Sequence, residues 1–236
     1  EHRLAIAQAV VAGKLHNYRQ LLLRSARDTT GDRQTALRDI AERHAAALAD
    51  LAKATALPEI LGIEGNAARD YFRGLALLAP GVMPGRTRRP PLDPFNCLLS
   101  FGYGMLRVAI HGALEQVGLD PYLGFLHGIR SGKPALALDL MEEFRPLLVD
   151  RLVLTLINRD QLDRKHVETL PGGAVQLPDD GRRFFLEQWS TARQREWHHA
   201  GLGRDIPAAL LPLVQARLLA RHLRGDSDAY LPWTLS

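Results

Sequence analysis

Apolar residues recur every three or four positions along most of the chain, which is the spacing of a helix with one buried face. The first such stretch runs from Leu4 to Ala26, and Thr30, Gly31 and Asp32 then interrupt the pattern. The same spacing predicts further helices over residues 33–51, 58–78, 95–117, 134–158, 181–198 and 206–223. No fixed-period repeat or low-complexity linker divides the chain. We therefore expect a mainly α protein in which the whole chain forms a single helical domain.

Three segments between the predicted helices have the composition of loops or turns. Residues 80–94 contain five prolines and two glycines, and Asp93 is a suitable N-cap for a helix with Pro94 at its first position. Residues 118–133 form a glycine-rich connector. Residues 168–180 contain the turn sequence PGG, and we interpret them as one small β-hairpin, the only plausible strand pair in the sequence.

Composition narrows the class of protein. The chain has 236 residues, of which 46% are hydrophobic, and this is enough for one sizeable core. No stretch approaches the roughly 18 to 20 uncharged apolar residues that cross a bilayer, so we expect no membrane contact. The single cysteine, Cys97, excludes an internal disulfide and a thiolate metal cage. It lies in an apolar run, where a small buried residue is expected, and a reducing cytoplasm fits this usage.

The charge balance favours an acidic partner. The net charge is +4, and the sequence isoelectric point is about 9.5. Such a protein binds nucleic acid more often than any other partner, although many basic proteins bind none. Nearly all of the cationic residues are arginines, which bind phosphate with a planar, bidentate geometry. A GC-rich genome would produce the same excess of arginine.

Two segments each contain one candidate metal ligand among small or apolar residues. Glu64 lies in GIEGNAARDYF, where small neighbours allow a ligand or another backbone to approach closely. The alternative is an ordinary glutamate near a helix start, favoured by the helix dipole. His127 lies in GFLHGIR, and histidine is the commonest side-chain metal ligand. The alternative there is a hydrogen-bonded, partly buried histidine without a ligand.

A third segment, LDLMEEFRP, concentrates acidic residues on a predicted helix. Asp139 and Glu142 are three positions apart and therefore share a helix face. Their mutual repulsion would be relieved by a cation between them, or simply by Arg145 and water. Together with His127 and Glu64, these carboxylates suit Mg²⁺ or Mn²⁺, which would polarise a phosphodiester. Zinc is disfavoured because the sequence has no HExxH motif and no cysteine set.

Four segments in this order resemble the family of the first CRISPR-associated protein, a metal-dependent DNA endonuclease and integrase that inserts new spacers into CRISPR arrays. They are GIEGNAARDYF, RTRRPPLDPFNCLLSFGYGML, GFLHG and LALDLMEEFRPLLVD. The early segment VAGKLHNYRQLLLR is similar to the start of that family's helical domain. The resemblance implies that Glu64, His127 and Glu142 are the metal ligands and catalytic residues, for Mg²⁺ or Mn²⁺. Asp139 matches an acid beside the site and is an auxiliary candidate.

The resemblance also implies a substrate and partners. The expected reaction is attack by a prespacer 3′-hydroxyl on a phosphodiester of the CRISPR repeat, so the partner is double-stranded DNA. The expected protein partner is the second CRISPR-associated protein, a small ferredoxin-like dimer. The expected location is the cytoplasm of a prokaryote, and the expected role is antiviral defence. The basic residues expected to contact DNA lie near the ligands in sequence or match the family pattern: Arg69, Arg86, Arg88, Arg89, Arg130, Lys133 and Arg145.

One departure and two other functions stay open. Family members carry an N-terminal β-rich domain that contributes to dimerisation, and this sequence lacks it and begins with Glu1. We expect the chain to be part of a longer polypeptide, a homodimer at full length, with an upstream fusion as the other possibility. The first alternative function is a non-catalytic DNA-binding scaffold with a degenerate metal site. The second is a helical metallo-phosphohydrolase acting on small molecules.

Overall fold

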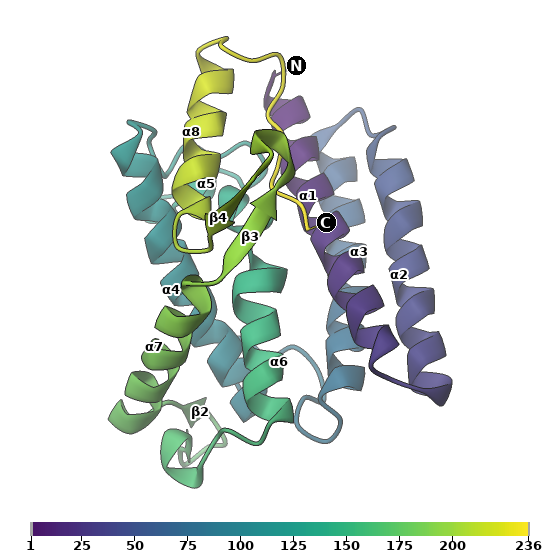
Figure 1. The fold of residues 1–236 in the computed structure, drawn as a ribbon, viewed down its shortest axis with the longest axis vertical. Coiled ribbons are helices and arrows are strands. Elements are labelled where there is room, and N and C mark those ends of the chain that lie inside the picture. The colour runs from purple at the N-terminus through teal and green to yellow at the C-terminus, as the bar shows by residue number, and fades with distance from the viewer. Residues whose placement is uncertain (1, 236) are drawn as a thin grey trace.

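The computed structural model describes residues 2–235, apart from the side chain of Arg164, and it is mainly α-helical as predicted. Figure 1 shows α1, α2 and α3 side by side on one side of the molecule and α4, α7 and α8 on the other, with α6 between them. The helices are α1 (His2–Arg27), α2 (Gly31–Leu51), α3 (Leu57–Leu78), α4 (Pro94–Gln116), α5 (Ala135–Met141), α6 (Arg151–Asn158), α7 (Asp179–Arg193) and α8 (Leu211–Leu223). The strands are β1 (Glu168–Thr169), β2 (Val175–Gln176), β3 (Glu196–His199) and β4 (Arg204–Pro207).

Large aromatic side chains join the first helices into one layer. Tyr18 of α1 stacks on Tyr71 of α3 with ring centroids 3.5 Å apart, and both rings are fully buried. Close approach of α1 and α3 also requires Gly74, because a Cβ there would meet Leu22 Cδ2 at 2.6 Å. This packing fixes the rotation of α1 relative to α3, and therefore decides which of their polar residues face one another.

The predicted N-terminus of α4 is confirmed. Asp93 is the N-cap, its carboxylate accepts from the backbone N–H of Asn96 at 2.7 Å, and Pro94 follows at the first helical position. By length and hydropathy α4 could cross a bilayer, which the composition did not suggest. Half of its apolar window is buried, and the helix packs against α5, α6 and α8. Its apolar residues thus contribute to the core.

The predicted helix over residues 134–158 is divided into three parts. After α5, a π-helical turn spans Arg145–Asp150, and α6 then continues the same path. Pro146 has no N–H to donate back to Glu142, so a regular ladder cannot pass through this point. The turn instead closes with a hydrogen bond from the Arg151 N–H to the Pro146 carbonyl. Such turns recur at functional sites.

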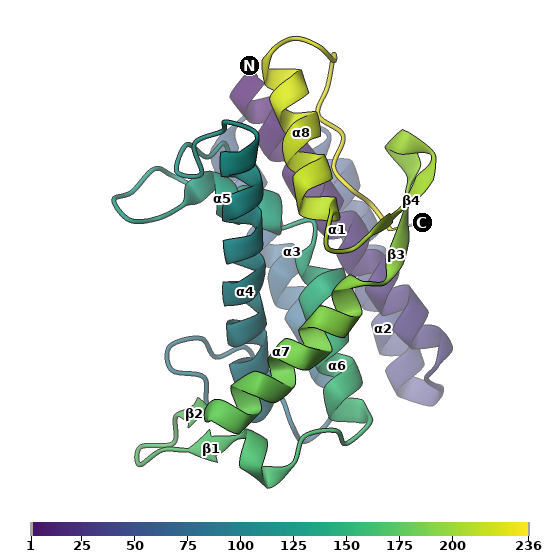
Figure 2. The ribbon, with the colours of Figure 1, turned by 60° about the vertical axis from the view of Figure 1, so that its left-hand side comes forward.

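The prediction of a single strand pair is wrong. The expected hairpin exists as β1 and β2, but β3 and β4 form a second antiparallel pair where helices were expected to reach His198 and to begin at Ile206. Exposed and buried side chains alternate along the end of β3, and Gly203 turns the chain with φ of 60°. Figure 2 shows this hairpin projecting beside α1 and α8.

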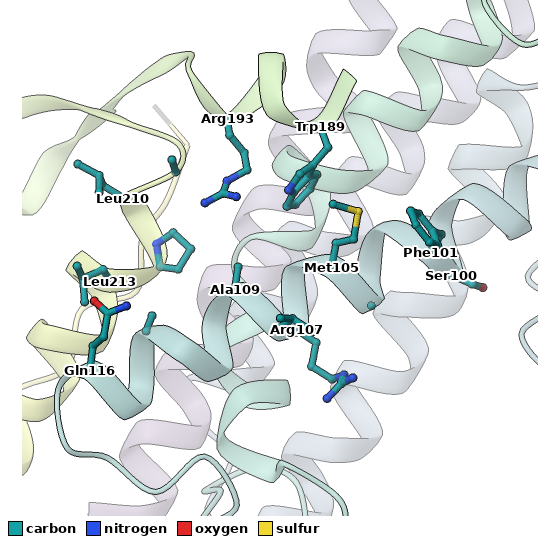
Figure 3. Close-up of a pocket in the computed structure, with 15 residues that line it drawn as sticks. Ser100, Phe101, Met105, Arg107, Ala109, Gln116, Trp189, Arg193, Leu210 and Leu213 are labelled. Carbon is teal, nitrogen blue, oxygen red and sulfur yellow. The ribbon is translucent and has the colours of Figure 1, made fainter. Parts of the chain in front are cut away.

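An apolar hollow of about 760 Å³ lies between α4, α7 and α8. Figure 3 shows the side chains of Met105 and Trp189 pointing toward each other on one side of it, with Leu213 of α8 on the other side. Arg107 and Arg193 flank the apolar surface. None of the predicted ligands or DNA-contacting residues lines this hollow.

Candidate metal centre and nucleic-acid interface

His127 is held in place by Asp139 of α5. The fully buried carboxylate of Asp139 accepts from the His127 backbone N–H at 2.9 Å, and the same oxygen lies 2.6 Å from His127 Nδ1. The other oxygen accepts from the backbone N–H groups of Phe125 and Leu126 at 2.6 and 2.9 Å. A neutral imidazole that donates its Nδ1–H to this carboxylate presents the lone pair of Nε2 to a ligand.

The loop can approach α5 this closely because residue 124 is glycine. A Cβ on Gly124 would lie 2.7 Å from Ala135 Cβ and 2.9 Å from the carboxylate of Asp139. Asp139 was expected as an auxiliary metal ligand. Its two oxygens instead face the loop, which is the arrangement of an outer carboxylate that orients a ligating imidazole.

Glu64 and Glu142 converge on the ammonium group of Lys14. Glu64 lies on α3 and Glu142 directly follows α5, yet both form ion pairs with Lys14 Nζ, the second at 2.7 Å. Lys14 lies on α1 and is 1% exposed. Three segments far apart in sequence therefore place two carboxylates around one positive charge.

Arg145 holds Glu142 from the other side. Its Nη1 lies 3.1 Å from both carboxylate oxygens of Glu142, and its guanidinium packs 4.2 Å from the ring centroid of Tyr103. Burial alone would raise the pKa of Glu142, but Arg145, Lys14 and the nearby His127 outweigh it and lower the pKa to about 2. Glu142 is therefore ionised. Arg145, expected to contact DNA, is buried and directed at Glu142.

The donor set suits a hard divalent cation. Two carboxylates and one imidazole nitrogen match Mg²⁺ or Mn²⁺, and the free Nε2 of His127 together with the ionised Glu142 fits such an ion. In residues 2–235, however, no three His, Cys, Asp or Glu side chains are grouped closely enough to form a metal cluster as they stand. Lys14 is the cation that joins Glu64 to Glu142.

A basic hollow opens directly beside Glu64. It has a volume of about 760 Å³ and lies between α3 and the loop before α4. Its lining combines small and apolar residues with Glu64 and four arginines: Arg69, Arg73, Arg86 and Arg88. The predicted Arg69, Arg86 and Arg88 are thus brought together with a predicted ligand, whereas Arg73 was not predicted. Arg69 and Arg88 are exposed, as phosphate contacts must be.

Arg86 has a different environment from its neighbours. Its guanidinium donates to Asn96 Oδ1 at 2.7 Å and packs 5.6 Å from the ring centroid of Phe72. Burial lowers its pKa below the usual value. Arg86 thus fixes the shape of the loop at the edge of the hollow, and Asn96 holds that loop again through its bond to the Gly85 carbonyl at 2.6 Å.

The remaining predicted DNA contacts are on loops. Arg89 is exposed in the proline-rich loop, and Arg130 is exposed in the segment that follows His127. Lys133 is partly buried and pairs with Arg130 in a tight turn through its backbone N–H. Arg130 and Lys133 do not line the basic hollow, and they lie in the segment that follows His127 in the sequence.

A buried acid lies behind the site. Asp150 accepts from the hydroxyl groups of Tyr71 and Tyr103 at 2.8 and 2.5 Å and is fully buried. Burial raises its pKa from 3.8 to about 6, against the opposing effects of Arg145 and the tyrosine hydrogen bonds. The folded state therefore holds this proton more tightly than the unfolded state does.

This shift predicts a pH dependence of stability. The contribution of Asp150 to the free energy of unfolding is largest below about pH 4 and falls by roughly 2 to 3 kcal/mol as the pH rises to about 6. Asp150→Asn cannot titrate, so relative to wild type it should become more stable over this range. Urea unfolding of both proteins from pH 4 to 7 measures the difference, and parallel profiles would contradict the assignment.

Comparison with known proteins finds one family along most of the chain. The family model described as CRISPR associated protein Cas1 matches residues 1–191. The chain is 48% identical over 235 residues to a Moorella thermoacetica protein named CRISPR-associated endonuclease Cas1 1. The match covers 97% of this chain and 68% of the relative, so the chain spans about two thirds of that relative's length.

Two solved structures share the fold closely. A casposase bound to integration product aligns with a TM-score of 0.82 and 25% identity, covering 97% of this chain and 63% of the casposase chain. A Cas6-RT-Cas1–Cas2 complex aligns with a TM-score of 0.84 and 28% identity, covering 99% of this chain and 25% of that chain. Both are similar to this chain over nearly all of its length.

Proposed function

The chain belongs to the family of CRISPR-associated Cas1 proteins, and we propose that it contains the catalytic centre of a metal-dependent DNA integrase. One observation carries the proposal: Glu64 and Glu142 converge on a single cation, and Asp139 leaves the Nε2 of His127 free. Relatives named endonucleases and a structural neighbour bound to an integration product support a reaction on phosphodiesters. The reaction proposed is attack of a prespacer 3′-hydroxyl on a repeat phosphodiester.

Glu64, Glu142 and His127 would hold Mg²⁺ or Mn²⁺. A divalent ion bound there would stabilise the negative charge that develops on the phosphate during attack. The residues around it have separate tasks. Asp139 orients the imidazole, Arg145 keeps Glu142 ionised, and the π-helical turn that follows Glu142 places Arg145 against it.

The basic hollow beside Glu64 would bind the DNA backbone. Its exposed arginines, Arg69, Arg73 and Arg88, can neutralise phosphates on the path toward Glu64. Such contacts fix the position of the scissile phosphate relative to the metal ligands, which is what in-line attack requires. Double-stranded DNA is therefore the proposed substrate, as prespacer and as repeat, rather than a small phosphate ester.

We propose that the working partner is the second CRISPR-associated protein, Cas2, a small ferredoxin-like dimer. A complex whose name includes Cas1 and Cas2 aligns over 99% of this chain, which supports a Cas2 partner. A homodimer is proposed for the longer protein, and the prokaryotic cytoplasm is its proposed location.

The competing function is a DNA-binding scaffold with a degenerate metal site. One observation favours it, because Lys14 occupies the position between the two carboxylates that an ion would take. A strand-transfer assay decides between the two functions. It uses a labelled prespacer and a repeat-bearing plasmid, with and without Mn²⁺, Mg²⁺ and the partner protein. Metal-dependent joining supports the integrase, whereas DNA binding without any metal-dependent joining or nicking supports the scaffold.

Salt dependence separates a DNA enzyme from an enzyme acting on small phosphate esters. The affinity for duplex DNA should fall steeply between about 50 and 200 mM salt because counterions are released from the backbone. Arg69→Ala combined with Arg73→Ala should reduce the slope of log affinity against log salt by about 2, because two phosphates are then no longer neutralised. Fluorescence anisotropy of a labelled duplex measures the slope.

A matched double variant controls for the loss of charge. Arg217 and Arg221 are exposed on α8, far along the chain from the basic hollow, and are one helical turn apart like Arg69 and Arg73. Arg217→Ala with Arg221→Ala should leave the salt slope nearly unchanged. Equal effects of the two double variants would show that net charge, and not the hollow, determines binding.

A further inference from the structure

Lys14 is a buried charge in the middle of a core-facing helix stripe. Its neighbours on α1, Val11, Leu15 and Tyr18, are all fully buried or nearly so. Its ammonium lies 5.5 Å from the ring centroid of Tyr18 and pairs with Glu64 and Glu142. Removing an ammonium group from water costs several kcal/mol unless close partners compensate. The position of Lys14 is therefore tied to the two carboxylates.

The charges of this group balance without any metal. Glu64 and Glu142 contribute two negative charges, and Lys14 and Arg145 contribute two positive charges, all joined by ion pairs. Asp139 pairs with His127 and not with Lys14 or Arg145, so its negative charge is left out of this balance. A divalent ion added to this neutral group would leave an excess of two positive charges in a largely buried site. Either an anion must arrive with the ion, or the ammonium must withdraw.

We propose that Lys14 is a resident counter-ion that competes with the divalent ion for Glu64 and Glu142, so that the metal is held tightly only when a DNA phosphate is present. This inference rests on the proposed metal centre and adds its regulation. The lysine stem is flexible, so the ammonium can leave the carboxylates and contact the phosphate as a point charge. Metal and DNA binding are then coupled, and coupling is reciprocal.

The coupling has a functional consequence. Without DNA, the carboxylates are satisfied by Lys14 and the centre binds divalent ions weakly. With DNA in the basic hollow, the phosphate supplies the negative charge that a metal-loaded centre lacks. The metal centre is therefore completed only when DNA is bound. Without DNA it should not act on other phosphate esters.

The test measures Mn²⁺ binding by the wild-type chain and by Lys14→Met. The readout is the electron paramagnetic resonance signal of the Mn²⁺ that stays free in solution. Methionine keeps the length of the side chain and removes the charge. In the absence of DNA, Lys14→Met should bind Mn²⁺ about tenfold more tightly than wild type. A short duplex should increase the affinity of the wild type by a similar factor and that of Lys14→Met much less. Equal Mn²⁺ affinity of the two proteins, or weaker binding by the variant, overturns the inference.

Three further variants keep the result interpretable. Lys14→Arg retains the charge and should behave like wild type, whereas Lys14→Gln removes it and can hydrogen-bond both carboxylates if the methionine variant does not fold. Combined with Lys14→Met, Glu64→Gln should abolish the increase in Mn²⁺ affinity that Lys14→Met produces. This result would place the ion at this centre. If wild type and Lys14→Met bind Mn²⁺ equally well and Glu64→Gln does not, the metal centre stands and only the role of Lys14 fails. If none of the proteins binds Mn²⁺ with or without DNA, both proposals fail.

Discussion

Replacing His127 by alanine is expected to reduce metal-dependent strand transfer at least a hundredfold while leaving the helical fold intact. Losing an outer-shell partner of a metal commonly costs about ten- to hundredfold in activity, and losing a ligand should cost more. His127 is 26% exposed in its side chain, and its removal takes one of four hydrogen-bond donors from the fully buried Asp139 carboxylate. We therefore expect the free energy of unfolding to fall by about 1 to 3 kcal/mol while the helical fold is retained. The strand-transfer assay measures activity, and circular dichroism with urea unfolding measures the fold.

His111 provides a matched control. Its side chain is 24% exposed, and it pairs with a glutamate one turn away on α4, apart from the three proposed ligands. His111→Ala should therefore retain strand transfer. A folded His127→Ala protein that integrates DNA at the wild-type rate would refute the metal assignment.

The second large effect is expected at Asp139. Both of its oxygens accept hydrogen bonds, so the amide group of Asp139→Asn must turn its NH₂ toward an N–H donor of the loop or toward the ring of His127. The loop loses a buried acceptor, and His127 loses the partner that fixes its tautomer. We expect the affinity for Mn²⁺ to fall by about ten- to hundredfold.

The tautomer of His127 distinguishes positioning from a general loss of structure. Nitrogen chemical shifts of the imidazole report which ring nitrogen carries the proton. In wild type the proton should be on Nδ1, and in Asp139→Asn a mixture with the Nε2–H form should appear. Asp150→Asn, which also replaces a fully buried carboxylate, should leave the His127 tautomer unchanged. An unchanged His127 tautomer in Asp139→Asn would contradict the proposal that Asp139 orients the imidazole.

Much of the fold follows from hydrophobic spacing alone. The predicted helices over residues 33–51, 58–78 and 95–117 lie within two residues of α2, α3 and α4 at each end. These helices have one continuous apolar face, the break at Thr30 and Gly31 separates the first two helices of the chain, and the N-cap at Asp93 is a local signal. Local pattern and tertiary packing agree in this half of the chain.

The second half departs from the pattern where local signals conflict with tertiary contacts. The residues of β3 and β4 have helical spacing, but Gly203 and Pro207 favour a turn and an edge strand. Pro146 was visible in the sequence, yet the apolar positions on both sides of it continue at helical intervals. Proline therefore changed the type of helix without ending it, and a single-sequence pattern does not resolve that difference.

The site was only partly predictable. Glu64, His127 and Glu142 were predicted from chemistry and resemblance, and the structure brings Glu64 and Glu142 to one cation. Lys14 was missed, although a lysine inside the apolar stripe of the first helix was a signal for a buried ion pair. The distinct tasks of Asp139 and Arg145 depend on which way each side chain points, and sequence spacing does not give that.

Spectroscopy of bound Mn²⁺ tests the central claim, that Glu64, Glu142 and His127 hold one divalent ion. Electron spin echo spectra of the chain loaded with Mn²⁺ and a short duplex detect a directly bound imidazole through its nitrogen hyperfine coupling. We expect this coupling in wild type and in His111→Ala, and its loss in His127→Ala. Bound Mn²⁺ without nitrogen coupling in wild type, or the same coupling in His127→Ala, would contradict the account.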